Sequence, residues 1–400
     1  MKDRTMSMQT NRYLNAMRLI AALIVVCGHI RTSIYIDFSQ VSHTFVATAI
    51  YALSALGNPA VMVFFALSGY WVGGPAARQV IAGTFNFRDY FSRRIVRLWL
   101  VLFPALLLTA ILDFAGSAFF STADIYSRPD IYAGIPDAPD HSILTFFGNI
   151  LFLQEVKIPE FGYNKPLWSL ALEFWYYMAF PLCMLAFSKK FSAGARVASA
   201  AGVVIAIAIG GEIFLKDASA WVIGTLLGIY PDKATALRQR LGENGRSVLR
   251  LFAPIVLFVV MAAARTKAEG TWYTVLALGL AAAFAIFAFG EDENKPAPTL
   301  SLLSHASECT YSLYAIHMPI VVILAAWLTP VHQNRMELMS WKAMILVVIV
   351  ATLYVIAWIF ARFTEQNTNQ VRRWLSNRFF PKTSGNPTLD KGDIGVVPRL

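Results

Sequence analysis

Long apolar runs recur along this chain and restrict it to one class of fold. Of its 400 residues, 57% are hydrophobic and only 14% are charged. Several runs approach or exceed the roughly 18 to 20 residues that a helix needs to cross a bilayer. The runs are continuous, whereas the strands of a membrane barrel alternate apolar and polar residues. We therefore predict an all-α fold, a polytopic bundle of transmembrane helices in a lipid bilayer.

About ten spans account for these runs. They are predicted over residues 13–34, 57–73, 95–114, 167–187, 196–215, 218–230, 248–264, 271–290, 309–328 and 341–363. The run over 143–153 is too short to cross upright, so we interpret it as an interfacial or re-entrant segment. Residues 41–56 are also apolar and are expected to form a helical extension before the second span.

The polar segments are too short for a separate soluble domain. We predict one transmembrane domain over residues 1–365 and a cytoplasmic tail over 366–400. The end of this tail is rich in Pro, Gly, Ser, Thr and Asp, a composition typical of disorder. The first apolar run carries Arg18 and His29 and lacks a convincing cleavage site, so we interpret it as a retained helix rather than a signal peptide.

The distribution of charge orients the predicted spans. The segment 78–94, after the second span, holds four arginines, whereas the stretch 113–140 contains five aspartates against one arginine. Cytoplasmic loops carry an excess of Lys and Arg. This rule is satisfied when both termini are cytoplasmic and 143–153 does not span. The net charge of +10 is explained by such loops and does not indicate nucleic-acid binding.

The cysteines and histidines show no disulfide or metal pattern. Cys27, Cys183 and Cys309 fall in apolar segments, where a cysteine is usually a small buried hydrophobe. The six histidines are scattered without ligand spacing. We expect no bound metal.

Arg18 and His29 are the most informative polar residues of the first span. They are eleven positions apart, which places them on nearly the same helical face and about 16 Å apart along the axis. An ionisable group at membrane depth costs a few kcal/mol or more. Two such groups on one stripe indicate a wet or protein-lined interior, and an imidazole there can take a proton from an alcohol during acyl transfer. The alternative for His29 is a structural histidine.

A second candidate is Glu173, in the block Trp168-Ser169-Leu-Ala-Leu-Glu173. Ser169 precedes it by four residues, and Tyr176 and Tyr177 follow by three and four, so these side chains share a helical face. A carboxylate in an apolar segment needs a cation or hydrogen bonds. A purely structural glutamate is the alternative interpretation.

Arg93, Arg94 and Arg97 lie at the cytoplasmic start of the third predicted span. They either set the topology or capture an anionic, phosphate-bearing donor. Guanidinium groups suit the second role because they bind phosphate oxygens through paired hydrogen bonds.

The second predicted span contains Ser68-Gly69-Tyr70. A Ser-Gly pair allows close approach of a backbone to another helix or to a ligand. Packing and ligand binding are both open interpretations here.

The ninth predicted span opens with Thr310, Tyr314 and His317 on one face. Pro319 lacks the N–H that would bond the carbonyl of Ala315, so a kink and a free acceptor are expected. Structural and functional interpretations remain open for this motif.

Taken in order, these blocks resemble the membrane acyltransferase-3 family. The similarity rests on Arg18…His29, Phe64-Phe-Ala-Leu-Ser-Gly-Tyr70, Arg93-Arg94…Arg97, Leu167-Trp-Ser-Leu170…Glu173 and Tyr311-Ser-Leu-Tyr314…His317-Met-Pro319, within residues 11–365. The resemblance implies a ten-helix membrane enzyme that moves an acyl group, often acetyl from acetyl-CoA, onto hydroxyls of cell-surface carbohydrates. The family's closing Glu-x-Pro-like element corresponds at best to Glu365-Gln-Asn.

On this basis we hypothesise an O-acyltransferase of the bacterial inner membrane, a transferase of groups other than aminoacyl groups. Its acceptor is a cell-surface or exported polysaccharide or the lipid-linked precursor, and acyl-CoA is a co-substrate rather than a bound cofactor. Arg18, Arg93, Arg94 and Arg97 are the expected donor-binding residues. Nothing in the sequence specifies an oligomeric state.

His29 and Glu173 are the expected catalytic residues. His29 either acts as general base on the sugar hydroxyl or takes the acyl group itself. Glu173 either holds and polarises the acceptor or pairs with His29. The supporting residues expected near the acceptor are Ser68, Tyr70, Trp168, Ser169, Tyr314 and His317.

Two other classes of function also fit intramembrane charges. A transporter or flippase of a sugar-linked lipid would carry them, but it would not turn over acyl-CoA. A non-catalytic membrane sensor would respond to loss of His29 only through the output of a partner.

Overall fold

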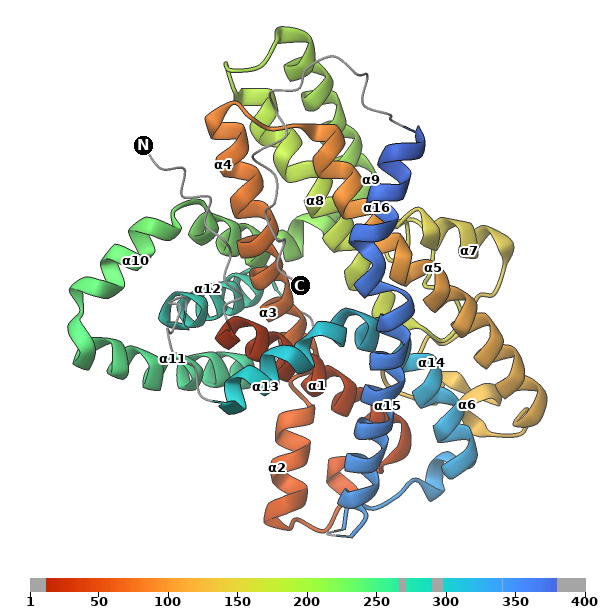
Figure 1. Ribbon diagram of the computed structural model, residues 1–400. Helices are drawn as coiled ribbons and strands as arrows, with labels where there is room; N and C mark the ends of the chain where they lie inside the picture. Colours follow the sequence, from red (N-terminus) through yellow and green to blue (C-terminus); the bar gives the residue numbers. More distant parts are fainter. Residues whose placement is uncertain (1–11, 266–270, 290–297, 340, 380–400) are drawn as a thin grey trace.

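The computed structural model describes residues 12–265, 271–289, 298–339 and 341–379. Within these ranges the chain folds into helices joined by turns (Figure 1). In chain order the α-helices are α1 (Arg12–Ile34), α2 (Phe45–Ser54), α3 (Gly57–Ser68), α4 (Gly74–Ala82), α5 (Phe87–Phe119), α6 (Asp124–Ser127), α7 (Ile143–Ile150), α8 (Trp168–Phe187), α9 (Ala193–Ile229), α10 (Pro231–Arg240), α11 (Gly242–Arg265), α12 (Trp272–Phe289), α13 (Pro298–Ala306), α14 (Thr310–Leu328), α15 (Ala343–Phe363) and α16 (Thr368–Phe379). A π-helical turn, Gly69–Gly73, joins α3 to α4, and short 3-10 segments lie at Phe38–Gln40, Pro129–Ile131, Lys165–Leu167, Ser307–Cys309, His332–Asn334 and Glu365–Asn367.

The helix lengths confirm the predicted class of fold. In the described part of the chain, nine helical segments are long and apolar enough to cross a membrane. The helices α1, α8, α12, α14 and α15 begin and end within two residues of the predicted bounds. The short run that was not expected to span forms only the eight-residue α7, and the extension predicted before the second span contains the short apolar helix α2.

The predicted spans over 196–215 and 218–230 are joined in the single helix α9. Its backbone leaves the helical region at Gly211, where φ is 57° and ψ is −149°. Glycine adopts this conformation readily because it has no Cβ. The second half of α9, Asp217–Ile229, is shorter than the nine long segments, so the predicted span over 218–230 corresponds to a short apolar helix.

The helix α5 begins eight residues before the predicted span that started at residue 95. Asn86 caps it, because the side-chain oxygen accepts a hydrogen bond from the backbone N–H of Asp89 at 3.1 Å. The 33 residues of α5 exceed what a hydrocarbon core of about 30 Å requires. The arginines at its start therefore lie on helical turns rather than in a loop.

The carbonyl that Pro319 leaves free in α14 finds a partner. The side-chain amide of Asn164 donates to the Ala315 oxygen at 2.9 Å and to the Thr109 hydroxyl at 3.0 Å. Asn164 is fully buried. It therefore ties the segment before α8 to both α14 and α5, which fixes the position of the Trp168–Glu173 block.

The Ser68–Gly69 pair lies at a close contact between two backbones. A Cβ on Gly69 would lie 2.0 Å from the Trp221 carbonyl oxygen of α9, and a Cβ on Gly224 would lie 1.9 Å from the Ala66 carbonyl oxygen of α3. Small residues permit such close approach between membrane helices. The backbones of α3 and α9 are therefore in close contact beside Ser68.

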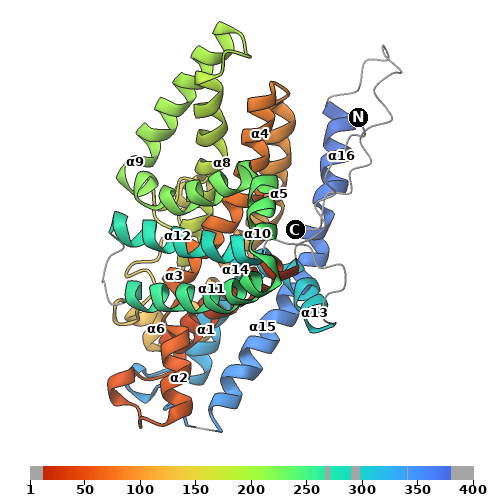
Figure 2. The same cartoon turned by 90° about the vertical axis from the view of Figure 1, so that its left-hand side faces the viewer.

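The bundle has two distinct ends in Figure 1. α2 and the connection from α14 to α15 lie at one end, and α4 and α16 lie at the other. In Figure 2, α11 and α12 run alongside each other and across the direction of α4 and α16. We name these the α2 end and the α4 end. Under the predicted topology the α2 end faces outward and the α4 end faces the cytoplasm.

The predicted tail begins with ordered structure. The turn Glu365–Asn367 follows α15 and leads directly into α16. The disorder predicted for the end of the tail concerns residues 380–400, which lie outside the described residues.

Candidate active site

An internal cavity collects side chains from five separate helices. Its volume is about 90 Å³, and α1, α3, α5, α8 and α14 contribute to its wall. The predicted site residues that line it are Arg18, Ser68, Arg97, Ser169, Glu173 and Tyr314. We call it the Arg18 cavity. The residues Trp71 and Val72 of the π-helical turn also line it, which places it toward the α4 end.

Arg18 is held in this cavity by contacts on two sides. Its Nη2 atom donates to the Ser307 carbonyl oxygen at 2.7 Å and to the Ser307 hydroxyl at 3.3 Å. The guanidinium carbon lies 5.6 Å from the centre of the Trp71 ring, a cation–π distance. The Nε atom is buried without a hydrogen-bond partner among the described residues. Arg18 therefore has a buried donor that the described residues leave unsatisfied.

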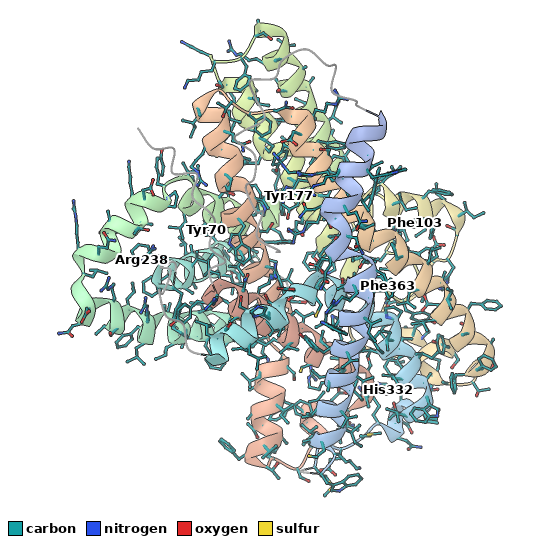
Figure 3. All side chains as sticks on the ribbon, viewed as in Figure 1. Tyr70, Phe103, Tyr177, Arg238, His332 and Phe363 are labelled. Atoms are coloured by element: carbon teal, nitrogen blue, oxygen red, sulfur yellow. The ribbon has the colours of Figure 1, made fainter. Side chains whose placement is uncertain are left out.

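Glu173 accepts hydrogen bonds from two hydroxyl groups on the same wall. The Ser68 hydroxyl donates to its Oε1 atom at 2.6 Å, and the Tyr177 hydroxyl donates to the same atom. Ser68 also accepts a hydrogen bond from the Trp221 indole at 3.3 Å. Figure 3 places Tyr177 inside the bundle. The partner that a carboxylate at this depth requires is thus a pair of hydroxyls.

The three arginines at the start of α5 have three different environments. Arg97 lines the Arg18 cavity. Arg94 lies over the rings of Tyr90 and Tyr177, at 5.8 and 5.9 Å from their centres. Arg93 forms an ion pair with Asp89. Of the three, only Arg97 presents its side chain directly to the cavity.

His29 lines a second and larger cavity. Its volume is about 410 Å³, within the range of about 300–1,000 Å³ that is usual for small-molecule sites. Trp168 lies on the same wall, and so do Ser54 from the end of α2 and Gly134 from the connection between α5 and α7. We call it the His29 cavity. Because Ser54 of α2 lines this cavity, the cavity lies toward the end of the bundle that we named the α2 end.

A wall of polar side chains separates the two cavities. The ring of His29 lies 5.2 Å from the ring of His317, which is fully buried. Nδ1 of His317 lies 2.8 Å from the Tyr314 carbonyl oxygen, and the Tyr314 hydroxyl lies 2.6 Å from the Ser169 hydroxyl. Ser169 lines the Arg18 cavity, whereas its neighbour Trp168 lines the His29 cavity. The start of α8 and the middle of α14 therefore form the partition.

The structure does not bring all of the predicted site residues together. Glu173 does not pair with His29, because its hydroxyl partners hold it in the Arg18 cavity while His29 lies in the other. Tyr70 lines neither cavity. It follows Ser68 by two positions, and residues two apart on a helix point in different directions.

Several contacts around the Arg18 cavity could not be read from local spacing. Ser307 and Trp221 reach Arg18 and Ser68 from distant parts of the chain. Glu365 is buried and accepts hydrogen bonds from the Ser312 N–H and hydroxyl at 3.2 and 3.1 Å. Its charge acts on Arg18. Trp71 is the exception, since it follows Ser68 by three residues and shares its face.

The loop before α8 holds a buried carboxyl group, that of Glu160, beside a second one, that of Glu155. Burial and a hydrogen bond to Glu155 raise the pKa of Glu160 to about 8. The backbone is strained nearby, because Phe152 and Glu155 have φ values of 59° and 62°. The Glu160 charge acts on Tyr314 of the partition. This loop is therefore electrostatically coupled to the site.

Comparison with known proteins identifies relatives of the chain. A family model described as an acyltransferase domain, that of the acyltransferase-3 family, matches residues 11–362. The chain is 31% identical over 173 residues to acyltransferase MdmB of Streptomyces mycarofaciens. This matched region covers 42% of this chain and 38% of that protein. It is 29% identical over 135 residues to an uncharacterised protein of Haemophilus influenzae, which covers 32% of this chain and 50% of that protein. The matches thus span half or less of either relative, and no solved structure matches the chain.

Proposed function

The chain belongs to the acyltransferase-3 family, whose model spans nearly all of it, and from this premise we propose the reaction that this membrane acyltransferase carries out. It transfers an acyl group, acetyl from acetyl-CoA, to a hydroxyl of a cell-surface or exported polysaccharide or its lipid-linked precursor. The enzyme works in the bacterial inner membrane, with the donor in the cytoplasm and the acceptor outside.

One observation carries this proposal. The two polar residues of the α1 stripe line two different cavities, Arg18 toward the α4 end and His29 toward the α2 end. A helix spacing of eleven residues separates them by about 16 Å, which is roughly half of a 30 Å hydrocarbon core. A donor and an acceptor that approach from opposite compartments need such a pair of sites.

The Arg18 cavity suits the acyl end of the donor. Its volume of about 90 Å³ lies below the usual size of a site for a whole drug-sized ligand. It therefore takes the thioester end, while the nucleotide stays at the cytoplasmic mouth. Arg97 lies on the cavity wall and Arg94 nearby at the start of α5, and guanidinium groups bind phosphate oxygens with good geometry.

The His29 cavity suits the acceptor. Its larger volume accommodates a sugar, and Trp168 offers an aromatic face on the wall. For the reaction, the thioester carbonyl has to reach the partition beside His29. There His29 takes the proton of the acceptor hydroxyl, and the hydroxyl oxygen attacks the carbonyl carbon. The new C–O bond forms, the C–S bond breaks, and the proton on the imidazole passes to the departing thiolate. An ester and free coenzyme A are the products.

The proposal is tested on the cell's own glycans. Mass spectrometry compares surface polysaccharide from cells that lack the protein with cells that express the wild type, His29→Ala or His43→Ala. His43 is an exposed histidine of the α2 end that lines neither cavity, so its substitution is the matched control. We expect acetylation with the wild type and the control, and its loss with His29→Ala. Wild-type acetylation by His29→Ala would refute the role of His29.

A further inference from the structure

The wall of the His29 cavity carries an unbalanced positive charge. Arg31 and Arg265 both line this cavity, and Asp217 is the acidic residue on the same wall. The charge of Arg265 acts unfavourably on Arg31, so the two guanidinium groups lie close enough to repel each other. With a neutral imidazole at His29, the ionisable side chains that the described residues contribute to the wall sum to one positive charge.

The nearby acidic side chains do not cancel this charge. Asp37 acts on Arg31, but its carboxylate pairs with Arg335 at 3.1 Å. The guanidinium of Arg31 lies 5.1 Å from the centre of the Tyr51 ring, which stabilises a cation without neutralising it. Its Nε atom is buried and has no hydrogen-bond partner among the described residues. Arg31 is therefore a half-buried cation on the cavity wall, and the described residues leave one of its donors unsatisfied.

We propose that the acceptor bound in the His29 cavity is anionic, a sugar that carries a carboxylate or a phosphate, and that Arg31 and Arg265 bind this charge. This inference rests on the proposed function for the identity of the ligand as acceptor. Arg31 and His29 line the same cavity, so the anion is bound in the cavity that holds the imidazole. The acylated hydroxyl and the negative group of the sugar therefore share this cavity.

The two arginines also affect which acceptors the His29 cavity binds. An anion that neutralises Arg31 and Arg265 removes their mutual repulsion when the acceptor binds. A neutral sugar would leave that repulsion in place and would leave buried donors unpaired, which costs free energy. The cavity thus discriminates against neutral acceptors, because their binding does not remove the charge repulsion or satisfy the unpaired donors.

A cysteine reporter measures this charge without any knowledge of the acceptor. The full-length protein, with Cys27, Cys183 and Cys309 replaced by alanine, receives Asn58→Cys. Asn58 is exposed and lines the cavity. The thiol is then reacted with an anionic reagent, sulfonatoethyl methanethiosulfonate, and with a cationic one, trimethylammonioethyl methanethiosulfonate. The ratio of the two rates is divided by the ratio for the same two reagents with 2-mercaptoethanol, a small thiol in free solution.

We expect the normalised ratio to favour the anionic reagent by about fivefold, which corresponds to about 1 kcal/mol of Coulomb energy. Because Asp217 remains on the wall, the double substitution Arg31→Gln and Arg265→Gln should lower the ratio below one, in favour of the cationic reagent. Arg128→Gln is the matched control, because Arg128 pairs with Asp124 and lines neither cavity. A wild-type ratio of one, or a ratio that survives the double substitution, would overturn the inference.

Protection of the same cysteine identifies the charged group. The probes are methyl glucoside, methyl glucuronide and glucose 1-phosphate, which are neutral, carboxylate-bearing and phosphate-bearing. Slower labelling with either or both of the charged sugars supports the inference and names the group, whereas equal protection by the neutral sugar, or protection by none, contradicts it. Acetyl-CoA consumption is measured in parallel. A positive cavity without acyl transfer would refute the proposed function alone, and transfer with a neutral cavity would refute this inference alone.

Discussion

The imidazole rings of His29 and His317 lie 5.2 Å apart and are inclined by 44°. Nδ1 of His317 is 2.8 Å from the Tyr314 carbonyl oxygen, so this nitrogen carries the proton and donates it. The Nε2 atom is then an acceptor, and it is buried without a hydrogen-bond partner among the described residues. His317 thus presents a free lone pair in the partition, next to the proposed general base.

Two substitutions of His317 should distinguish the roles of its two ring nitrogens. Glutamine can place a polar atom near the Nε2 position, and asparagine near the Nδ1 position. If His317 orients His29 through Nε2, His317→Asn should lose on the order of a hundredfold or more in kcat, and His317→Gln should retain more activity. Acetyl-CoA turnover measures this, with unfolding temperatures as the control for folding. Activity retained by His317→Asn but lost in His317→Gln would assign His317 a structural role through the Tyr314 carbonyl.

Substitutions within the arginine cluster at the start of α5 should have unequal effects on KM for acetyl-CoA. Arg97→Gln removes a guanidinium from the cavity wall, and we expect KM for acetyl-CoA to rise by about tenfold, which equals about 1.4 kcal/mol. Arg93→Gln removes the same charge from a partly exposed ion pair with Asp89, which is worth only about 0–1 kcal/mol. Steady-state kinetics on both variants provides the comparison. Equal effects would mean that the whole cluster, and not the cavity wall, recognises the donor.

Stability should fall as pH rises through the range in which Glu160 loses its proton. Its pKa is raised from 4.5 to about 8 by burial and by the hydrogen bond to Glu155. Between these two values the folded protein holds a proton that the unfolded chain has released, so the free energy of unfolding decreases with pH. Glu160→Gln should flatten this dependence between pH 4.5 and 8. Asp130→Asn, an exposed substitution, should not, and unfolding temperatures across the range decide the matter.

The contact between α3 and α9 should not tolerate a methyl group. A Cβ on Gly69 would lie 2.0 Å from the Trp221 carbonyl oxygen, and forced overpacking costs about 1–3 kcal/mol. Gly194 is the matched control, because a Cβ there meets nothing within 4 Å and Ala favours a helix over Gly by about 0.5–1 kcal/mol. We expect a lower unfolding temperature for Gly69→Ala and an unchanged or higher one for Gly194→Ala. Equal stability of the two variants would contradict the close packing.

The helical period alone placed Arg18 and His29 on one stripe, and the same reasoning placed Ser169 with Glu173. The helical period could not predict the hydrogen-bond partners of these residues. Ser68 is 105 positions from Glu173, and Ser307 is 289 positions from Arg18. No periodicity connects residues so distant. For the same reason the sequence left open whether Glu173 pairs with His29, because that depends on which helix faces meet, and the structure places the two residues in different cavities.

The length and apolarity of the runs determined the helices of this protein, because a segment in lipid must satisfy its backbone hydrogen bonds internally and a helix does so without partners. Only the tertiary structure decided that Arg18 and His29 open into separate cavities with His317 between them. Lipid surrounds an apolar helix face as readily as another helix does, so hydrophobicity does not select which faces meet. Close contacts such as Gly69 against Trp221, and hydrogen bonds such as Asn164 to Ala315, make that selection.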